Sequence, residues 1–236
     1  DQNKSYTSSV FKKIIFKNVS FEYPSSKSKI LNKLNFEINK NDCIAIIGPS
    51  GSGKTTLIDL LIGLLYPTDG EILIDDKNSK NKSTLSNLSA YLPQESLILE
   101  DTIKRNVSLE TDENETDLNL INSSLENANL KTFIDSLPHG IETKIGEDSL
   151  RLSGGQKQRL SIARNFYLKK EIIVMDEATS SLDEENEDRI MDSLKNLKGK
   201  KTIILITHKL KLLKNFNKVY FLKNGDLKKV EDENYL

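Results

Sequence analysis

The eight residues at 48–55 have the sequence Gly-Pro-Ser-Gly-Ser-Gly-Lys-Thr and stand between two segments of opposite character. Before them lies Cys43–Ile47, a continuous apolar run that is typical of a strand buried on both faces. After them Thr55–Leu65 has the length of a helix and ends at Tyr66-Pro67. The pattern G-x-x-x-x-G-K-[ST] in this strand–loop–helix setting predicts a loop that binds phosphate groups.

Each residue type in this loop has a chemical reason. Gly51 and Gly53 let backbone N–H groups converge on phosphate oxygens, and the following helix presents its positive end to the same anion. Lys54 is placed to reach the terminal phosphates, and the Thr55 hydroxyl is placed to bind Mg²⁺. The competing interpretation is a flexible Gly/Ser loop, which the flanking strand and helix disfavour. The predicted ligand-binding residues here are Gly48, Pro49, Ser50, Gly51, Ser52, Gly53, Lys54, Thr55 and Thr56.

Two further segments carry chemistry. Ile172–Glu177 (IIVMDE) is an apolar strand that ends in two acids, Asp176 to hold Mg²⁺ through water and Glu177 to polarise an attacking water. Alone, this pair is also compatible with an acidic helix N-terminus. Leu152–Gln156 has the sequence LSGGQ, and a helix that begins at Ser153 with two glycines in its first turn makes a second anion site. The alternative for that segment is an ordinary glycine-rich N-cap.

Together, the segments at 48–55, 152–156 and 172–177 resemble the nucleotide-binding domain of ATP-binding cassette (ABC) proteins, in the family's order and over about residues 11–230. In that family two such domains close face to face, and each ATP lies between one domain's phosphate loop and the other's LSGGQ helix. The resemblance implies ATP and Mg²⁺ as cofactors, ATP hydrolysis as the activity and a second copy of the domain as a partner. It places four residues against the partner's ATP: Ser153, Gly154, Gly155 and Gln156.

The resemblance also assigns single residues. Tyr23 matches the aromatic residue that stacks on adenine, and Gln94 in Tyr-Leu-Pro-Gln matches the glutamine that senses Mg²⁺ and the attacking water. Asp183 in Ser-Ser-Leu-Asp matches the loop that crosses to the partner site, and His208 matches the histidine that contacts the γ-phosphate. Taken alone, Tyr23 and His208 are more often structural residues. The implied catalytic residues are Glu177, His208, Gln94 and Lys54, and the implied Mg²⁺ ligands are Thr55, Gln94 and, through water, Asp176.

Two segments, Asp101–Val107 and Leu137–Glu147, resemble exporters, whose cassettes are usually fused after a transmembrane domain. We therefore expect an ATP-driven exporter or flippase domain at the cytoplasmic face of the inner membrane, with a transmembrane partner on its N-terminal side. The chain departs from the exporter pattern at Asp148-Ser149, where Arg-Gly is common, and at Ser181, where Ala is common. These departures weaken claims about coupling contacts and leave the catalytic residues unaffected.

Two other functions stay open. One is a stand-alone ABC ATPase acting in DNA repair or translation, against which stand the missing long coiled coil and the missing second cassette. The other is a non-catalytic nucleotide-gated regulator, against which stands the complete catalytic set. The transported substrate is not encoded in a domain of this kind.

The composition limits the kinds of partner and environment that the chain can have. The 236 residues include 34 basic and 35 acidic side chains for a net charge of −1, so we expect no nucleic-acid partner. The lone Cys43 permits no intrachain disulfide and is expected to be a buried small apolar side chain. The longest apolar run, Leu57–Leu65, contains Asp59 and is too short to span a bilayer, so this piece is expected to be soluble. Because the chain begins with Asp1 and a polar segment, we expect residues 1–9 to be a linker or tag remnant of a longer polypeptide.

The resemblance implies an α/β fold class with a P-loop NTPase core (a RecA-like mixed sheet flanked by helices), an N-terminal antiparallel β-subdomain and an inserted α-helical subdomain. The core and the β-subdomain are expected at about residues 10–95 and 166–236, and the helical subdomain at about 96–165. Ser153–Tyr167 should form an N-capped amphipathic helix, residues 76–89 a polar loop, and Asn224-Gly225 the turn of a final hairpin.

Overall fold

The computed structural model describes residues 11–24, 28–78, 82–146 and 149–231. The expected linker at residues 1–9 and two residues of the exporter-like pattern, Glu147 and Asp148, lie outside this description. The chain divides into two compact units. The first comprises Asp1–Ala90, Lys170–Val174 and Lys198–Leu236, and the second comprises Tyr91–Lys169 and Met175–Leu197.

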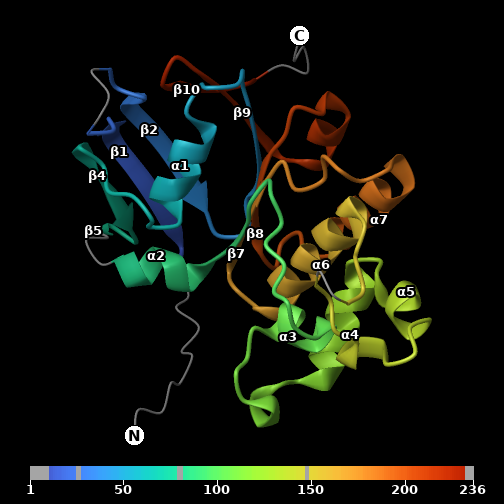
Figure 1. Ribbon diagram of the computed structural model, residues 1–236. Coiled ribbons are helices and arrows are strands. Elements are labelled where there is room, and N and C mark those ends of the chain that lie inside the picture. The colour runs from blue at the N-terminus through green and yellow to red at the C-terminus, as the bar shows by residue number, and fades with distance from the viewer. Residues whose placement is uncertain (1–10, 25–27, 79–81, 147–148, 232–236) are drawn as a thin grey trace, which may run out of the picture. The chain divides into compact units, whose positions relative to one another are not determined.

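A four-stranded antiparallel sheet with the order β2-β1-β4-β5 opens the first unit, and Figure 1 shows β1, β2 and β4 beside one another. Alternating inward residues give it a buried face, on which the Phe16 and Phe36 rings lie 5.9 Å apart. This is the predicted N-terminal β-subdomain. Its strands are β1 (Lys13–Phe21), β2 (Leu31–Asn39), β4 (Asp69–Ile74) and β5 (Lys77–Asn78).

The second sheet has six strands in the order β10-β9-β3-β8-β7-β6. Strand β3 (Cys43–Ile47) pairs in parallel with β8 and β9, and all five of its residues are buried, as its unbroken apolar sequence predicted. Strands β9 and β10 form the predicted antiparallel hairpin, which turns at Asn224 (φ 51°) and Gly225 (φ 75°). The sheet therefore contains both parallel and antiparallel strand pairs. The strands that accompany β3 in it are β6 (Ser89–Leu92), β7 (Ile172–Asp176), β8 (Thr202–Ile206), β9 (Lys218–Lys223) and β10 (Asp226–Lys229).

The core of the first unit forms around β3 and helix α1 (Lys54–Leu61). Leu57, Ile58 and Leu60 of α1 are each at most 1% exposed. Cys43 is buried as predicted, and burial raises the pKa of its thiol. It acts as a small apolar side chain of the sheet.

Helices dominate the second unit, and Figure 1 gathers α3, α4, α5 and α6 in one group. Both α3 and α4 pack against α6, which begins after Ser153 as predicted. The acidic, Asn-rich segment around residues 110–117 separates α3 from α4. The helices are α3 (Ile103–Ser108), α4 (Leu118–Asn127), α5 (Lys131–Asp135), α6 (Gly154–Tyr167) and α7 (Glu184–Lys195), with 3-10 turns η1 (Glu113–Glu115) and η2 (Gly140–Glu142). In the first unit, η3 spans Leu210–Asn215.

The prediction of a polar loop at residues 76–89 was wrong. The segment holds the short strand β5 and helix α2 (Lys82–Leu88). Leu85 and Leu88 are 3% and 1% exposed. Two apolar residues three positions apart lie on one helix face, and burying that face stabilises a helix whose composition is otherwise polar.

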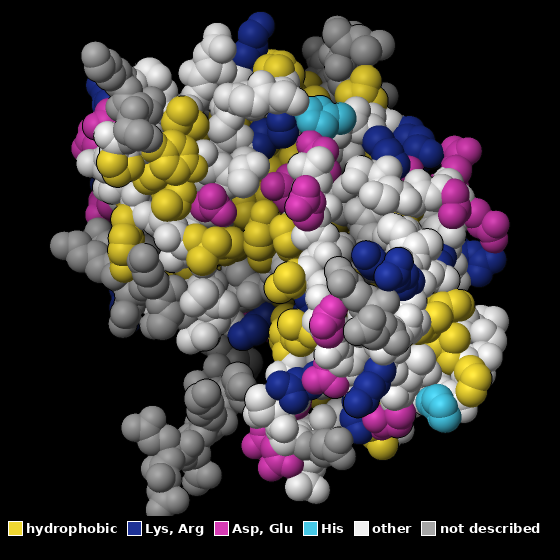
Figure 2. Space-filling model, in the orientation of Figure 1, with side chains coloured by type: hydrophobic (Ala, Val, Ile, Leu, Met, Phe, Trp, Pro, Cys, Tyr) yellow, Lys and Arg dark blue, Asp and Glu magenta, His cyan; other side chains and the backbone are white. Residues whose placement is uncertain are grey.

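The distribution of charged side chains on the surface agrees with the near-zero net charge. Figure 2 shows basic and acidic side chains interspersed on the face that it presents. Among the described helices, none combines the length and the apolar content that a membrane crossing requires.

Candidate active site

The loop at 48–53 connects β3 to α1 and is shaped by its glycines. A Cβ on Gly48 would stand 2.1 Å from the carbonyl oxygen of Leu222 in β9, so only glycine fits there. Gly53, the N-cap of α1, has a φ of 102°, which side-chain-bearing residues rarely adopt. At Gly51 nothing lies within 4 Å of the corresponding Cβ position. The loop therefore presents backbone rather than side chains at its open tip.

Lys54 places a cation inside this loop. Its Nζ donates to the carbonyl oxygens of Gly48 and Pro49, each at 2.9 Å, and the residue is 8% exposed. The neighbouring Ser52 Oγ is buried and has no hydrogen-bond partner within the described part of the chain. The first turn of α1 carries no acidic residue. A buried ammonium, an unused hydroxyl and a helix N-terminus are the donor set that a polyphosphate needs.

Tyr23 lies on the same unit, two residues beyond β1. Its hydroxyl is 3.2 Å from Thr56 Oγ1 in α1, and its ring meets Phe21 edge to face at a centroid distance of 4.9 Å. The residue remains 37% exposed. These contacts hold an aromatic face beside the helix that follows the 48–53 loop.

His208 stands beyond the end of β8. Residues Ile46 and Ile206 are paired in the parallel β3–β8 ladder, and Thr207 N donates to Ile46 O at 3.3 Å. Parallel strands in register end at one edge of a sheet, so the exposed His208 belongs to the edge from which the 48–53 loop departs.

In the second unit, Gln94 and Glu177 are in contact. Gln94 Nε2 donates to Glu177 Oε2 at 3.3 Å, although 83 positions separate them. Asp176 ends β7 and is buried. Glu177 follows with a φ of 49°, a left-handed conformation that is uncommon for a residue with a long side chain. Such backbone conformations cluster at functional sites.

Ser153 caps α6 in the predicted way. Its Oγ accepts from Gln156 N at 3.3 Å, and Gln156 Oε1 accepts from Ser153 N at 2.8 Å. This reciprocal pair satisfies two N–H groups of the first turn and leaves the exposed Gly154 without a covering side chain. The turn therefore has a defined shape and a bare backbone surface.

Asp183 is the N-cap of α7. Its carboxylate accepts from the Asn186 backbone N–H at 2.9 Å and from Asn186 Nδ2 at 2.6 Å. These two hydrogen bonds hold the pKa of the Asp183 carboxyl below its ordinary value. In this chain the carboxylate is thus already engaged in capping its own helix.

One residue of this region was not singled out from the sequence. Gln158 is 2% exposed, and its Oε1 accepts from Ser181 N at 3.2 Å. A signal was present, because Gln158 falls on the same helix face as the buried Ile162, where a polar side chain indicates a buried hydrogen bond.

The structure divides the predicted residues between the two units. Residues 48–56, Tyr23 and His208 belong to the first, and the second holds Gln94, Ser153–Gln156, Asp176, Glu177 and Asp183. Within each unit, segments far apart in sequence are brought together.

A family model, curated proteins and solved structures all match this chain. The family model described as ABC transporter matches residues 31–180. The chain is 37% identical over 215 residues to an ATP-dependent lipid A-core flippase of Bordetella avium, covering 90% of this chain and 36% of that protein. It is 37% identical over 229 residues to ABC transporter B family member 14 of Arabidopsis thaliana, covering 96% of this chain and 18% of that protein.

Among solved structures, that of a bacterial Atm1-family ABC exporter with ATP bound superposes with a TM-score of 0.85 at 33% identity, over 92% of this chain and 38% of that one. The chain thus spans about a third or less of the length of the relatives it matches.

Proposed function

This chain belongs to the ABC transporter family and is an ATP-binding, ATP-hydrolysing domain of it, and on that premise we propose that it drives a membrane exporter or flippase. Its relatives are named as a lipid A-core flippase and as export ATP-binding/permease proteins, and they are far longer than this chain. The proposed partner is a transmembrane domain fused on the N-terminal side. The proposed location is the cytoplasmic face of the membrane.

The observation that carries hydrolysis is the contact between Gln94 and Glu177. We assign Glu177 as the base or water-orienting group, because its carboxylate is held by an amide donor at the end of a buried strand. Gln94 would orient that carboxylate and the attacking water. The strained backbone at Glu177 supports the assignment.

Binding is assigned to the other residues. Lys54 and the N–H groups of the 48–53 loop would bind the phosphates, His208 the γ-phosphate, and Tyr23 the adenine. Mg²⁺, held by Thr55, Gln94 and, through water, Asp176, would neutralise charge on the β- and γ-phosphates. The chain's own contribution to the rate is to place these donors before the charge develops.

The chain carries two anion-binding segments, residues 48–55 and Ser153–Gln156. We propose that they serve two different ATP molecules, so that two copies assemble head to tail around two ATP. Ser153 of one copy would then donate to the γ-phosphate bound by the other, and Asp183 would lie at the same interface.

The test is Glu177→Gln in the full chain. We expect ATP binding to persist, turnover to fall by roughly 10²–10⁴-fold as for removal of a general base, and an ATP-bound dimer to accumulate. Phosphate release measures turnover, and light scattering with ATP measures the dimer. Glu126→Gln, the same change at an exposed position of α4, is the control and should behave like the parent chain. Near-normal hydrolysis by Glu177→Gln would contradict the assignment.

A further inference from the structure

The loop Ser180–Asp183, here called the 180–183 loop, rests on the first two turns of α6. Ser181 N donates to Oε1 of the buried Gln158 at 3.2 Å. A Cβ on Gly155 would meet Ser181 O at 3.6 Å and Leu182 Cδ2 at 3.8 Å, which is ordinary van der Waals contact. The loop is therefore packed against the same helix turns that carry the Ser153–Gln156 segment.

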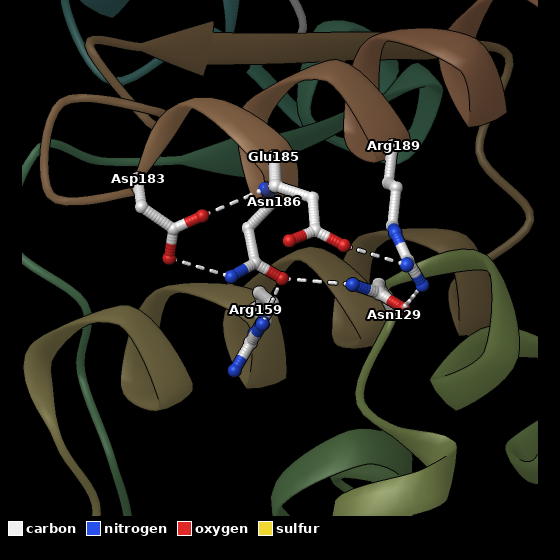
Figure 3. Close-up of polar contacts among 6 residues, drawn as sticks. All are labelled: Asn129, Arg159, Asp183, Glu185, Asn186 and Arg189. Atoms are coloured by element: carbon white, nitrogen blue, oxygen red, sulfur yellow. Dashed lines mark hydrogen bonds and ion pairs between the residues drawn. The ribbon is translucent and has the colours of Figure 1, made fainter.

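Asn186, in the first turn of α7, joins this loop to two other elements. Its backbone N–H and its Nδ2 donate to the two carboxylate oxygens of Asp183. Its Oδ1 accepts from Arg159 Nη1 in α6 and from Asn129 Nδ2, the latter at 2.7 Å (Figure 3). An amide oxygen has two lone pairs, and both are used here. One side chain thus connects α7, α6 and the turn between α4 and α5.

The surroundings favour a stiff junction. The Arg159 guanidinium is partly withdrawn from water, and this burial lowers its pKa. A charge-assisted hydrogen bond is stronger inside a protein than in water, so the bond from Arg159 to Asn186 gains from this burial. Asn129 Oδ1 accepts from Arg189 Nη1 at 3.1 Å, and Arg189 Nη2 donates to Glu185 Oε1 at 2.7 Å (Figure 3). The side chain of Asn129 is therefore held from two sides.

The 180–183 loop is also tied to the candidate catalytic residue. Ser180 N donates to the carbonyl oxygen of Glu177 at 2.9 Å, and Leu182 N donates to that of Thr179 at 3.2 Å. Two short hydrogen-bonded turns thus lead from Glu177 to Leu182, the residue before Asp183. The junction at Asn186 follows these turns, in the first turn of α7.

We propose that Asn186 is a positioning residue of the ATPase, which with Gln158 and Arg159 holds the 180–183 loop and the Ser153–Gln156 turn as one block. The proposal rests on the proposed function, in which both segments face the ATP bound by a second copy. A block with one fixed geometry presents both segments to that ATP together, which avoids the ordering cost of two independent loops at closure.

This role predicts a separation of kinetic effects. The side-chain hydrogen bonds of Asn186 go to Asp183, Arg159 and Asn129, none of which belongs to residues 48–56. Loss of the junction should therefore spare ATP binding by the phosphate loop of the same chain and impair the ATP-closed dimer. Purely structural damage would instead reduce the folded fraction and leave the dimer affinity of the remaining protein unchanged.

The experiment compares Asn186→Ala with Asn196→Ala, the same change at the exposed far end of α7, in the full chain. We expect Asn186→Ala to speed amide hydrogen exchange in peptides covering residues 151–158 and 178–184 by roughly fivefold, in line with local rather than global opening. We expect kcat for ATP hydrolysis to fall about three- to tenfold, with KM for ATP changed less than about twofold. The control should match the parent in all three quantities.

Several outcomes would overturn the proposal. One is unchanged exchange in both peptides of Asn186→Ala, and another is faster exchange with the kcat of the control. A parent chain that neither dimerises nor hydrolyses ATP would overturn the proposed function and this role with it, whereas an active parent with an unaffected variant would overturn this role alone. If Asn186→Ala does not fold, Asn186→Asp decides. It keeps the oxygen that accepts from Arg159 and loses the donor to Asp183, and parental kcat in that variant would contradict the proposal.

Discussion

Two glycines of the phosphate loop are required for different reasons. At Gly48 the limit is space, since any Cβ would collide with the Leu222 carbonyl at 2.1 Å. At Gly51 space is free, and the limit is the backbone φ of 75°, which costs a side-chain-bearing residue free energy. Glycine is therefore required by packing at position 48 and by backbone conformation at position 51.

Tyr23 provides a prediction at this scale. Tyr23→Ala removes the ring that is held by Phe21 and Thr56, and it should weaken ATP binding about 2- to 10-fold, the range expected for one aromatic contact. Tyr23→Phe keeps the ring and loses only the hydrogen bond to Thr56, so its affinity should stay near the parent value. A titration with ATP in the presence and absence of Mg²⁺ measures both. Equal affinity of the Ala variant and the parent would exclude stacking at this position.

At the scale of elements, the predicted ligand-binding turn at the start of α6 combines a local capping motif with a tertiary support. The N-terminus of α6 is shaped by its own Ser153–Gln156 pair, which lies within four residues of sequence. The support comes from Ser181 and Asn186, which are 23 and 27 positions away from their α6 partners. A cap is visible in the sequence because both partners are local, whereas its support is decided by packing.

Helix α1 contains an acid in an unfavourable setting. Burial raises the pKa of Asp59 above the ordinary 3.8, so the folded state binds its proton more tightly than the unfolded state does. At pH values below about 3.8 both states are protonated and Asp59 costs nothing, whereas above that range ionisation favours unfolding.

Asp59→Asn should therefore raise the Tm at about pH 7 and lose that advantage at about pH 3. The two residues have similar helix propensities, so the comparison isolates the charge. Calorimetry at the two pH values measures the effect, with the exposed Asp188→Asn as control. A gain that is equal at both pH values would rule out ionisation of Asp59 as its cause.

At the scale of the whole molecule, the proposed dimer makes activity depend on protein concentration. If each ATP needs residues 48–55 of one copy and Ser153–Gln156 of another, the rate per molecule should rise with protein concentration and level off when the dimer is saturated. Phosphate release across a dilution series measures this. A strictly monomeric protein with a constant rate per molecule would contradict the head-to-tail assembly.

Much of the site was predictable because its motifs are contiguous. The strand before the phosphate loop, the Ser153 cap and the hairpin at Asn224-Gly225 depend on residues within a few positions of each other, and all three are confirmed. The roles of the site residues and the expected subdomain boundaries stay predictions. Helix α2 was mistaken for loop because its stability comes from the burial of Leu85 and Leu88, which composition does not reveal.

The sequence by itself therefore determined the family and the fold class and predicted the residues that would meet ATP, because glycine conformation, helix caps and apolar runs act locally. Only the tertiary structure decided which distant groups support those residues. The contact of Gln94 with Glu177 and the junction at Asn186 join segments that are 83, 57 and 27 positions apart. Such pairs form only when the whole core folds, because closing the long loops between the partners costs conformational entropy that the core offsets. No local sequence pattern therefore predicts them.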